Sequence, residues 1–325
     1  PWNYIYPSTM HKSILILGAC GQIGTELTFA LRELYGNDQV VASDIREGSE
    51  SLMNSGPFEL LDATNYAAIE DVVMYHEIEE VYLMAAMLSA TAEKFPERAW
   101  NLNMNSLFNV LNLAKENKIE KVFWPSSIAV FGPNTPKDNT PQSTLMEPST
   151  VYGISTQSGE RWCSYYYHKF GVDVRSVRYP GLISWKTLPG GGTTDYAIEI
   201  YHEALNKGSY TCFLNEDAKL PMMFMDDAIR ATIKLMDCNS DQLTVRSSYN
   251  LSAMSLSPAD ISASIKKRIP DFKISYDPDF RQTIAETWPR SIDDTKAKED
   301  WGWEPQFNLE NTTTEMLKNL PSQSF

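Results

Sequence analysis

The chain contains 325 residues, the length of about two ordinary domains and enough to bury a sizeable core. It carries 28 lysine and arginine residues against 42 aspartate and glutamate residues, so its formal net charge is −14. A chain this acidic repels phosphate backbones and anionic lipid surfaces, which argues against nucleic-acid and membrane partners. The sequence has no apolar run of about 18 residues, so no transmembrane helix is predicted.

The cysteines and histidines do not form the spacings of a metal site. Cys20, Cys163, Cys212 and Cys238 are widely dispersed, form no C-x-x-C pair, and are expected to be free thiols in a reducing compartment. The four histidines lie at no ligand spacing, and no H-E-x-x-H motif is present. We therefore expect no metal ion.

The first half of the sequence alternates short apolar runs with stretches of helical periodicity. Strands are predicted over residues 13–17, 39–43, 58–61, 81–84 and 121–124, and helices over residues 22–34, 65–75 and 99–116. Strands that alternate with helices indicate βαβ units, and nearly continuous apolar strands fit a sheet that is covered on both faces. We predict an α/β fold with a doubly wound parallel sheet of the Rossmann type.

The pattern becomes less regular after Pro180. Three consecutive glycines occupy residues 190–192, and prolines punctuate a mixture of helical and short strand patterns. These features predict a smaller α+β region that follows the sheet.

A glycine-rich loop separates the first predicted strand from the first predicted helix. Gly18, Gly21 and Gly24 form G-x-x-G-x-x-G, in which glycine permits a tight turn and the helix N-terminus offers N–H groups to a pyrophosphate. Asp44 lies twenty residues later, where a carboxylate accepts both ribose hydroxyls of NAD and repels the 2′-phosphate of NADP. Arg46 is a counter-signal because arginine can bind that phosphate. The pattern favours NAD, with residues 1–180 as the NAD-binding domain. Residues 181–325 are expected to be mainly a substrate-binding region, partly interleaved with the sheet.

Two hydroxyl-bearing residues are candidates for the chemistry. Ser127 follows the fifth predicted strand, and Tyr152 opens the next helical pattern. A phenol with a lowered pKa can remove an alcohol proton while a hydride leaves the same carbon. A serine and a tyrosine are weak evidence by themselves, because buried packing pairs of this kind are common, so this assignment depends on its context.

That context resembles the extended short-chain dehydrogenase/reductases, and within them the L-threonine 3-dehydrogenases. The glycine loop, Asp44, the stretch at residues 126–132 and the tyrosine 25 residues after Ser127 carry the resemblance. Further similar segments lie at residues 85–90, 179–185, 189–196 and 288–294. The Gly-Gly-Gly-Thr-Thr-Asp-Tyr and Trp-Pro-x-Ser-Ile-Asp-Asp segments are the most specific, and the resemblance spans about residues 12–320.

The resemblance implies a set of site residues. In the catalytic group, Tyr152 is the general base, Ser127 holds the substrate hydroxyl, and Asn105 supports the active-site helix. The implied cofactor-binding residues are Gly18, Gly21, Gln22, Ile23, Gly24, Asp44, Asp62, Ala85, Tyr152 and Leu182. The implied substrate-binding residues are Ser89, Ser127, Tyr152, Thr193, Thr194 and Trp288. The sequence leaves open which of the two threonines points inward, and Trp288 could equally be a core aromatic.

One position departs from the family pattern. The family has Tyr-x-x-x-Lys, and the lysine position is occupied here by Thr156. In the family the lysine ammonium binds the nicotinamide ribose and lowers the pKa of the tyrosine. Position i+4 shares a helix face with Tyr152, but threonine supplies no charge there. The departure puts full activity in doubt more than it does the fold.

Three functions are considered. The leading hypothesis is NAD-dependent oxidation of L-threonine to 2-amino-3-ketobutyrate, a step of threonine catabolism. A nucleotide-sugar epimerase or dehydratase needs cations for its substrate pyrophosphate, yet Lys186 is the only basic residue between residues 180 and 194. Thr156 motivates a third hypothesis, a non-catalytic dinucleotide-binding protein, against which the retained Ser127 and Tyr152 argue.

The resemblance also carries expectations about assembly and location. Members of the family usually form a homodimer through the helices that here would cover residues 99–116 and 152–170. Eukaryotic relatives are mitochondrial, so a mitochondrial location is expected by resemblance, or a cytoplasmic one for a bacterial protein.

Overall fold

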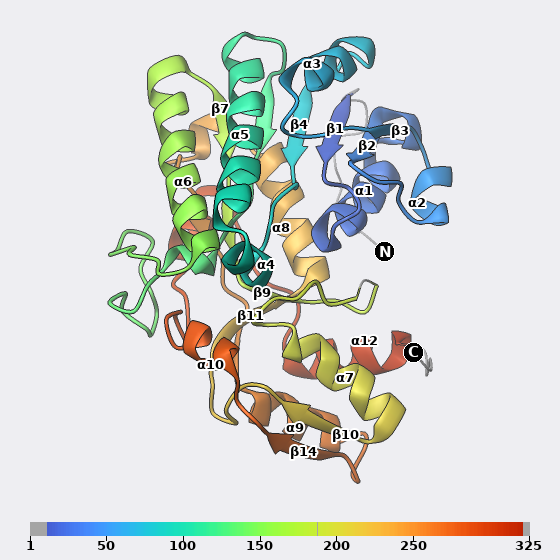
Figure 1. The fold of residues 1–325 in the computed structure, drawn as a ribbon, viewed down its shortest axis with the longest axis vertical. Coiled ribbons are helices and arrows are strands. Elements are labelled where there is room, and N and C mark those ends of the chain that lie inside the picture. Colours follow the sequence, from blue (N-terminus) through green and yellow to red (C-terminus); the bar gives the residue numbers. More distant parts are fainter. Residues whose placement is uncertain (1–11, 187, 321–325) are drawn as a thin grey trace.

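A computed structural model of the chain describes residues 12–186 and 188–320, apart from the side chains of Ser89 and Ala90 (Figure 1). Its central sheet has six strands in the order β3-β2-β1-β4-β5-β7, and every neighbouring pair is parallel. The strands are β1 (Ile14–Leu17), β2 (Val40–Asp44), β3 (Phe58–Leu60), β4 (Glu80–Leu83), β5 (Lys121–Phe123) and β7 (Asp173–Arg175). The order reverses between β1 and β4, as in doubly wound folds.

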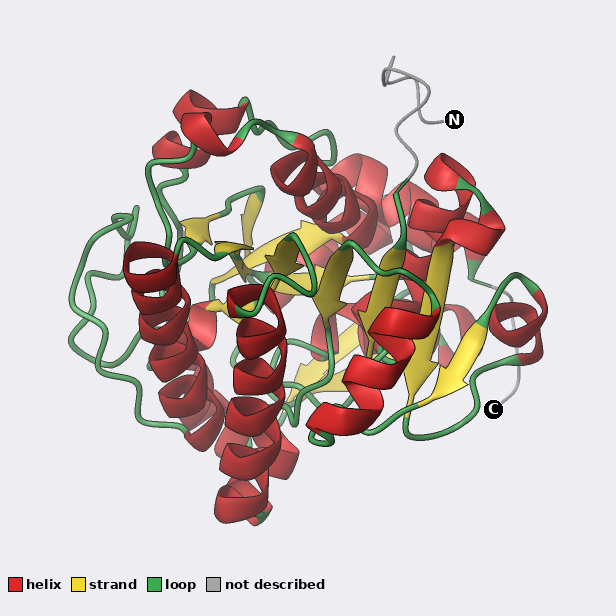
Figure 2. Ribbon diagram, turned by 90° about the horizontal axis from the view of Figure 1, so that it is seen from above, coloured by secondary structure: helices red, strands yellow, loops and turns green. Residues whose placement is uncertain are grey.

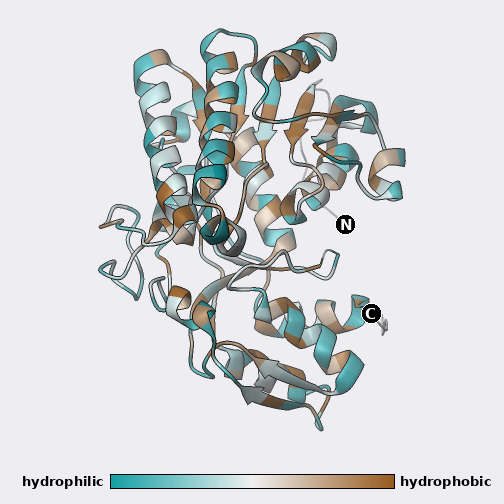
Figure 3. Cartoon of the chain, in the orientation of Figure 1, coloured by the Kyte–Doolittle hydropathy of each residue, from teal (hydrophilic) through white to brown (hydrophobic). Residues whose placement is uncertain are grey.

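Helices cover both faces of this sheet (Figure 2). Ile14 and Ile16 of β1 belong to a core cluster shared with α1 (Gln22–Tyr35) and α8 (Met225–Asp237). Leu15 and Leu17 belong to the cluster on the other face. That cluster is shared with α3 (Tyr66–Tyr75), α5 (Pro96–Lys115) and α6 (Val151–Phe170). β1 is therefore apolar on both faces, as its brown colour in Figure 3 shows, and the predicted doubly wound fold is confirmed.

The predicted elements of the first half are all present, with ends that differ by up to three residues. α5 starts at Pro96 instead of residue 99, because proline is well suited to the first turn of a helix. The short helices α2 (Glu50–Asn54) and α4 (Ser89–Lys94) carry no clear periodic pattern and were not predicted.

The remainder of the chain adds three small sheets, ordered β12-β8-β6, β13-β11-β9 and β10-β14. Their strands are β6 (Ser126–Ser127), β8 (Val177–Tyr179), β9 (Gly181–Ile183), β10 (Ser209–Cys212), β11 (Leu220–Phe224), β12 (Tyr249–Asn250), β13 (Met254–Leu256) and β14 (Lys273–Tyr276). The remaining helices are α7 (Tyr196–Lys207), α9 (Pro258–Lys266), α10 (Phe280–Ala285), α11 (Thr295–Trp301) and α12 (Leu309–Asn319).

The part of the chain beyond residue 180 contributes to two regions of the molecule. α7, α9, α12, β10 and β14 form the lower lobe in Figure 1, whereas α8 and α11 contribute to the core cluster that covers the central sheet. Within the described ranges, no helix is both long and apolar enough to cross a membrane.

Candidate active site

A cavity of about 240 Å³ lies at the carboxyl edge of the central sheet, where the lower lobe approaches it. It is lined by the connections that follow β1, β4 and β5, by the first turn of α6, and by β9 with residues 190 and 192–195. Ligands of open α/β sheets bind at this edge, where the strand order reverses. The cavity therefore brings together most of the residues predicted from the sequence.

The glycine loop after β1 is packed so closely that side chains are excluded. Gly18 has a φ of +89°, and a Cβ on it would lie 2.5 Å from the Ala85 nitrogen. A Cβ on Gly24 would lie 2.2 Å from the Gly18 carbonyl oxygen. A Cβ on Gly21, by contrast, would make only an ordinary contact, 3.5 Å from the Gly18 carbonyl oxygen, and Gly21 lines the cavity at the N-terminus of α1. The loop thus fits a pyrophosphate, which would approach the backbone at Gly21.

The other predicted cofactor-binding residues divide into three groups. Gln22, Ile23, Ala85 and Leu182 line the cavity. Asp44 does not line the cavity, and its carboxylate accepts hydrogen bonds from the N–H groups of Cys20 in the glycine loop, at 3.0 Å, and of Ile45, at 2.8 Å. Asp62 is exposed, and its Oδ1 accepts hydrogen bonds from the N–H and hydroxyl of Thr64.

Ser127 and Tyr152 line the same cavity. The Ser127 Oγ accepts a hydrogen bond from the Ala129 N–H at 3.2 Å, which leaves its own proton available for a substrate oxygen. Burial raises the pKa of Tyr152, and hydrogen bonding to the hydroxyls of Thr156 and Ser127 opposes that shift without cancelling it. The phenol is therefore protonated at neutral pH.

Thr156 occupies the lysine position of the family pattern without its charge. It is 4% exposed and lines the cavity, and its Oγ1 donates a hydrogen bond to the Tyr152 carbonyl oxygen at 2.7 Å. Among the described residues, no lysine, arginine or histidine lines the cavity. No neighbouring cation therefore lowers the pKa of the phenol.

The predicted Asn105 does not line the cavity, and another asparagine of α5, Asn103, lines it instead. Asn105 is exposed, whereas Asn103 is buried and lines the cavity. The Asn103 Oδ1 accepts a hydrogen bond from the Met87 N–H at 2.9 Å, and its Nδ2 donates to the Ser155 Oγ at 3.2 Å. Helical periodicity could have found it, because Asn103 follows the buried Ala99 by four residues.

The predicted substrate side of the cavity includes the residues just before α7. Thr193 and Thr194 both line the cavity, and Thr193 is the more buried. Asp195 holds the glycines that precede Thr193 in place. Its Oδ2 accepts hydrogen bonds from the N–H groups of Gly191 and Gly192 at 2.7 and 2.6 Å. Burial raises the pKa of Asp195, while these two hydrogen bonds lower it.

Trp288 also lines the cavity and is 6% exposed, and its Nε1 has no hydrogen-bond partner among the described residues. The predicted Ser89 is the first residue of α4, but its side chain lies outside the described part of the structure.

A buried ion pair behind the site was missed from the sequence. Glu160 of α6 is hydrogen bonded to the Arg178 Nε and Nη2 at 2.8 and 2.9 Å, and it also accepts from the Ser126 Oγ at 2.6 Å. Neither charged side chain is more than 3% exposed. The pair joins α6, the helix of Tyr152, to β8, and the Ser126 hydrogen bond joins α6 to β6, the strand of Ser127. No local sequence pattern signals these contacts.

Comparisons with known proteins identify relatives over nearly the whole chain. The model of the "NAD dependent epimerase/dehydratase family" matches residues 14–251. An uncharacterized epimerase/dehydratase of Staphylococcus haemolyticus is 52% identical over 311 residues, which cover 95% of this chain and 98% of that protein.

Two solved structures are similar in both sequence and fold. A GalE-like L-threonine dehydrogenase from Cupriavidus necator, in its holo form, is 56% identical with a TM-score of 0.93, over 95% of this chain and 100% of that one. An L-threonine dehydrogenase from Clostridium difficile is 47% identical with a TM-score of 0.94, over 96% and 98%. With the site described above, these similarities show that the chain is an enzyme of the NAD-dependent epimerase/dehydratase family, the extended short-chain dehydrogenase/reductases.

Proposed function

We propose that this enzyme oxidises L-threonine at its 3-hydroxyl to 2-amino-3-ketobutyrate, with NAD as the cofactor. The observation that carries the proposal is the cavity in which the glycine loop, Ser127, Tyr152 and the Thr193–Thr194 pair meet without any basic side chain among the described residues. A small zwitterionic substrate fits such a cavity. The similarity to L-threonine dehydrogenases supports the same substrate.

Each residue has a defined task in this reaction. The Ser127 hydroxyl donates a hydrogen bond to the reacting oxygen of the substrate and holds it near Tyr152. The Tyr152 phenolate takes the proton of that hydroxyl as a general base. The bound dinucleotide supplies the acceptor for the hydride that leaves C3. Asn103 keeps the loop at Met87 and the start of α6 in register through its three hydrogen bonds.

Cofactor discrimination is assigned to Asp44. Its carboxylate lies against the glycine loop, where it would accept hydrogen bonds from the adenosine ribose and repel a 2′-phosphate. Arg46, the competing signal, is exposed. NAD is therefore proposed over NADP.

The two alternatives make different demands on this cavity. A nucleotide-sugar epimerase must hold a second pyrophosphate, and no cation lines the described part of the cavity to do so. A non-catalytic dinucleotide-binding protein would explain Thr156, but it would not need a serine and a tyrosine in the same cavity.

An NADH absorbance assay of the purified protein separates the three functions. With NAD and L-threonine we expect NADH to accumulate, and with UDP-glucose or UDP-galactose we expect little turnover. UDP-sugar turnover without threonine oxidation would establish the epimerase alternative. NAD binding without turnover of any substrate would establish the non-catalytic one.

A homodimer through α5 and α6 is proposed as the assembly. Trp100, Ile154, Trp162, Tyr165 and Phe170 are large hydrophobic side chains of these helices, each at least 37% exposed. Exposed apolar surface of this kind marks an interface. A solved L-threonine 3-dehydrogenase at 51% identity is described as monomeric, so light scattering on the eluting protein should decide between the two states.

The mitochondrial location gains no support from the staphylococcal relative, which is bacterial. For a bacterial protein, a cytoplasmic location is proposed.

A further inference from the structure

A buried carboxylate on α1 contacts the segment from Leu182 to Asp195, of which residues 182–186 and 188–195 are described, and this segment lines the cavity at both of its ends. Leu182 lines it at one end and residues 190 and 192–195 at the other. Glu26 is 5% exposed and lies four residues after Gln22, which also lines the cavity, so the two side chains share one face of α1. Glu26 thus connects the helix that follows the glycine loop to the segment that carries the substrate-side residues.

Both oxygens of this carboxylate face the segment. The Ser184 Oγ, in a residue that is 1% exposed, donates a hydrogen bond to the Glu26 Oε2 at 2.5 Å and accepts one from the Lys186 N–H at 3.1 Å. The Lys186 ammonium lies 3.7 Å from the Glu26 Oε1 and 3.9 Å from the Asp226 Oδ1. One carboxylate therefore contacts the segment at two residues, through a buried hydroxyl and a partly exposed cation.

Burial brings the pKa of the Glu26 carboxyl close to neutrality. Burial raises its pKa to about 7, while the Ser184 hydrogen bond and the Lys186 charge oppose the shift and the Asp226 charge adds to it. Asp226, at the first turn of α8, itself has a raised pKa because of burial. Glu26 therefore changes charge over the range in which the enzyme would work.

We propose that Glu26 is a positioning residue whose charged carboxylate fastens the segment from Leu182 to Asp195 over the cavity, so that dinucleotide binding strengthens as Glu26 ionises. The inference rests on the proposed function, because it takes the dinucleotide as the occupant of the cavity. A charged carboxylate accepts a stronger hydrogen bond from Ser184 and attracts Lys186, and protonation weakens both contacts.

Calorimetric titration with NAD tests the dependence on charge. With half-ionisation near neutrality, Glu26 is charged in about a tenth of the molecules at about pH 6 and in about nine tenths at about pH 8, so binding should tighten about tenfold between them. The Glu26→Gln variant should bind NAD equally at both values. The Glu33→Gln variant, which removes an exposed carboxylate of the same helix, should behave as the wild type. A tenfold dependence that persists in Glu26→Gln would overturn the inference.

Hydrogen–deuterium exchange of the cofactor-free protein separates this inference from the proposed function. At about pH 8, residues 182–186 and 188–195 should exchange about tenfold faster in Glu26→Gln than in the wild type or Glu33→Gln, since their local opening becomes easier. Unchanged protection of that segment would overturn the role of Glu26, whether or not threonine is oxidised. Altered protection together with a lack of threonine oxidation would count against the proposed substrate alone.

Discussion

Tyr152 and Thr156 are the residues at which this chain departs most from its family pattern. A phenol with the ordinary pKa of about 10 is ionised at neutral pH in less than about one molecule in a hundred. In this protein burial raises the pKa of Tyr152, so the ionised fraction is smaller still. No cation of the described cavity lining compensates. The oxidation rate is therefore expected to rise steadily above neutral pH.

Thr156→Lys restores an ammonium one helical turn from Tyr152 and should move the acidic limb of the kcat profile to lower pH. Thr156→Val, which has a similar volume and no charge, is the matched control and should not move it downward. Tyr152→Phe should abolish turnover and leave NAD binding largely intact. Profiles of kcat against pH for these variants are the measurement, and an unchanged limb in Thr156→Lys would show that another group already serves the phenol.

Asp44 carries the prediction on cofactor choice. We expect NAD to bind at least about tenfold more tightly than NADP, a difference of about 1.4 kcal/mol. Asp44→Ala should reduce this preference because it removes both the acceptor for the ribose hydroxyls and the repulsion of the phosphate. Calorimetry with the two dinucleotides measures this preference. Equal affinities in the wild type would show that Arg46, and not Asp44, governs the binding of the ribose.

At the scale of elements, a buried ion pair joins α6, which carries Tyr152, to β8. Replacing Glu160 by glutamine keeps the shape but leaves the Arg178 charge buried without its partner, which costs about 3–5 kcal/mol. Urea unfolding should show this loss, whereas Glu33→Gln on the exposed face of α1 should change stability by less than about 0.5 kcal/mol. A Glu160→Gln variant as stable as the wild type would show that the pair is dispensable.

α5 illustrates how an element can be predicted while its facing residues are not. Its periodicity places Ala99, Leu107 and Val110 on the buried face, and Asn103 falls on that face whereas Asn105 does not. The resemblance pointed to an asparagine in this stretch, where several occur close together. Only the angular position on the helix distinguishes the buried one.

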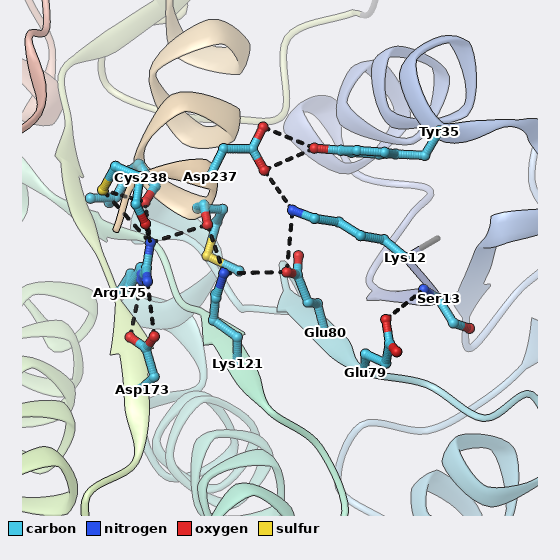
Figure 4. Close-up of polar contacts among 12 residues, drawn as sticks. Lys12, Ser13, Tyr35, Glu79, Glu80, Lys121, Asp173, Arg175, Asp237 and Cys238 are labelled. Atoms are coloured by element: carbon cyan, nitrogen blue, oxygen red, sulfur yellow. Dashed lines mark hydrogen bonds and ion pairs between the residues drawn. The ribbon is translucent and has the colours of Figure 1, made fainter. Parts of the chain in front are cut away.

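At the scale of the whole molecule, a network of ion pairs and hydrogen bonds lies at the amino edge of the sheet, opposite the cavity (Figure 4). The Lys12 Nζ lies 2.6 Å from Asp237 at the end of α8 and 3.3 Å from Glu80 at the start of β4. Arg175 donates hydrogen bonds to the carbonyl oxygens of Leu235 and Cys238, each at 2.7 Å. The network attaches α8 to the central sheet.

Asp237→Ala removes one of the two carboxylates beside the Lys12 ammonium, whose side chain is only 10% exposed, and it also removes an acceptor of the Tyr35 hydroxyl. We expect a loss of about 1–3 kcal/mol, measured by urea unfolding. Asp71→Ala, which removes an exposed carboxylate, serves as the control. Equal stability of the two variants would show that the network contributes nothing measurable.

The same network predicts a limit at acid pH. Burial opposes the ionisation of Asp173, but its bonds to Arg175 and the charge of Arg246 hold its pKa below 3.8 overall. A carboxyl whose pKa is lower in the folded than in the unfolded state stabilises the fold above the unfolded value, and this stability is lost as the pH falls through the folded one. Asp173→Asn should therefore reduce stability at neutral pH and flatten its decline below about pH 4. Thermal unfolding across that range measures the effect.

The sequence alone determined the features that short-range patterns encode. Apolar strands, helical periods and the glycine spacing specify the sheet, its covering helices and the loop at the carboxyl edge, because each depends on neighbouring residues. Only the tertiary structure decided which distant side chains meet. Glu160 and Arg178 are 18 residues apart, Glu26 and Ser184 are 158 apart, and Lys12 and Asp237 are 225 apart. Such pairs depend on how whole elements pack against one another, and the periodicity of a local sequence does not report on that packing. The same packing decided that no described cation reaches the cavity.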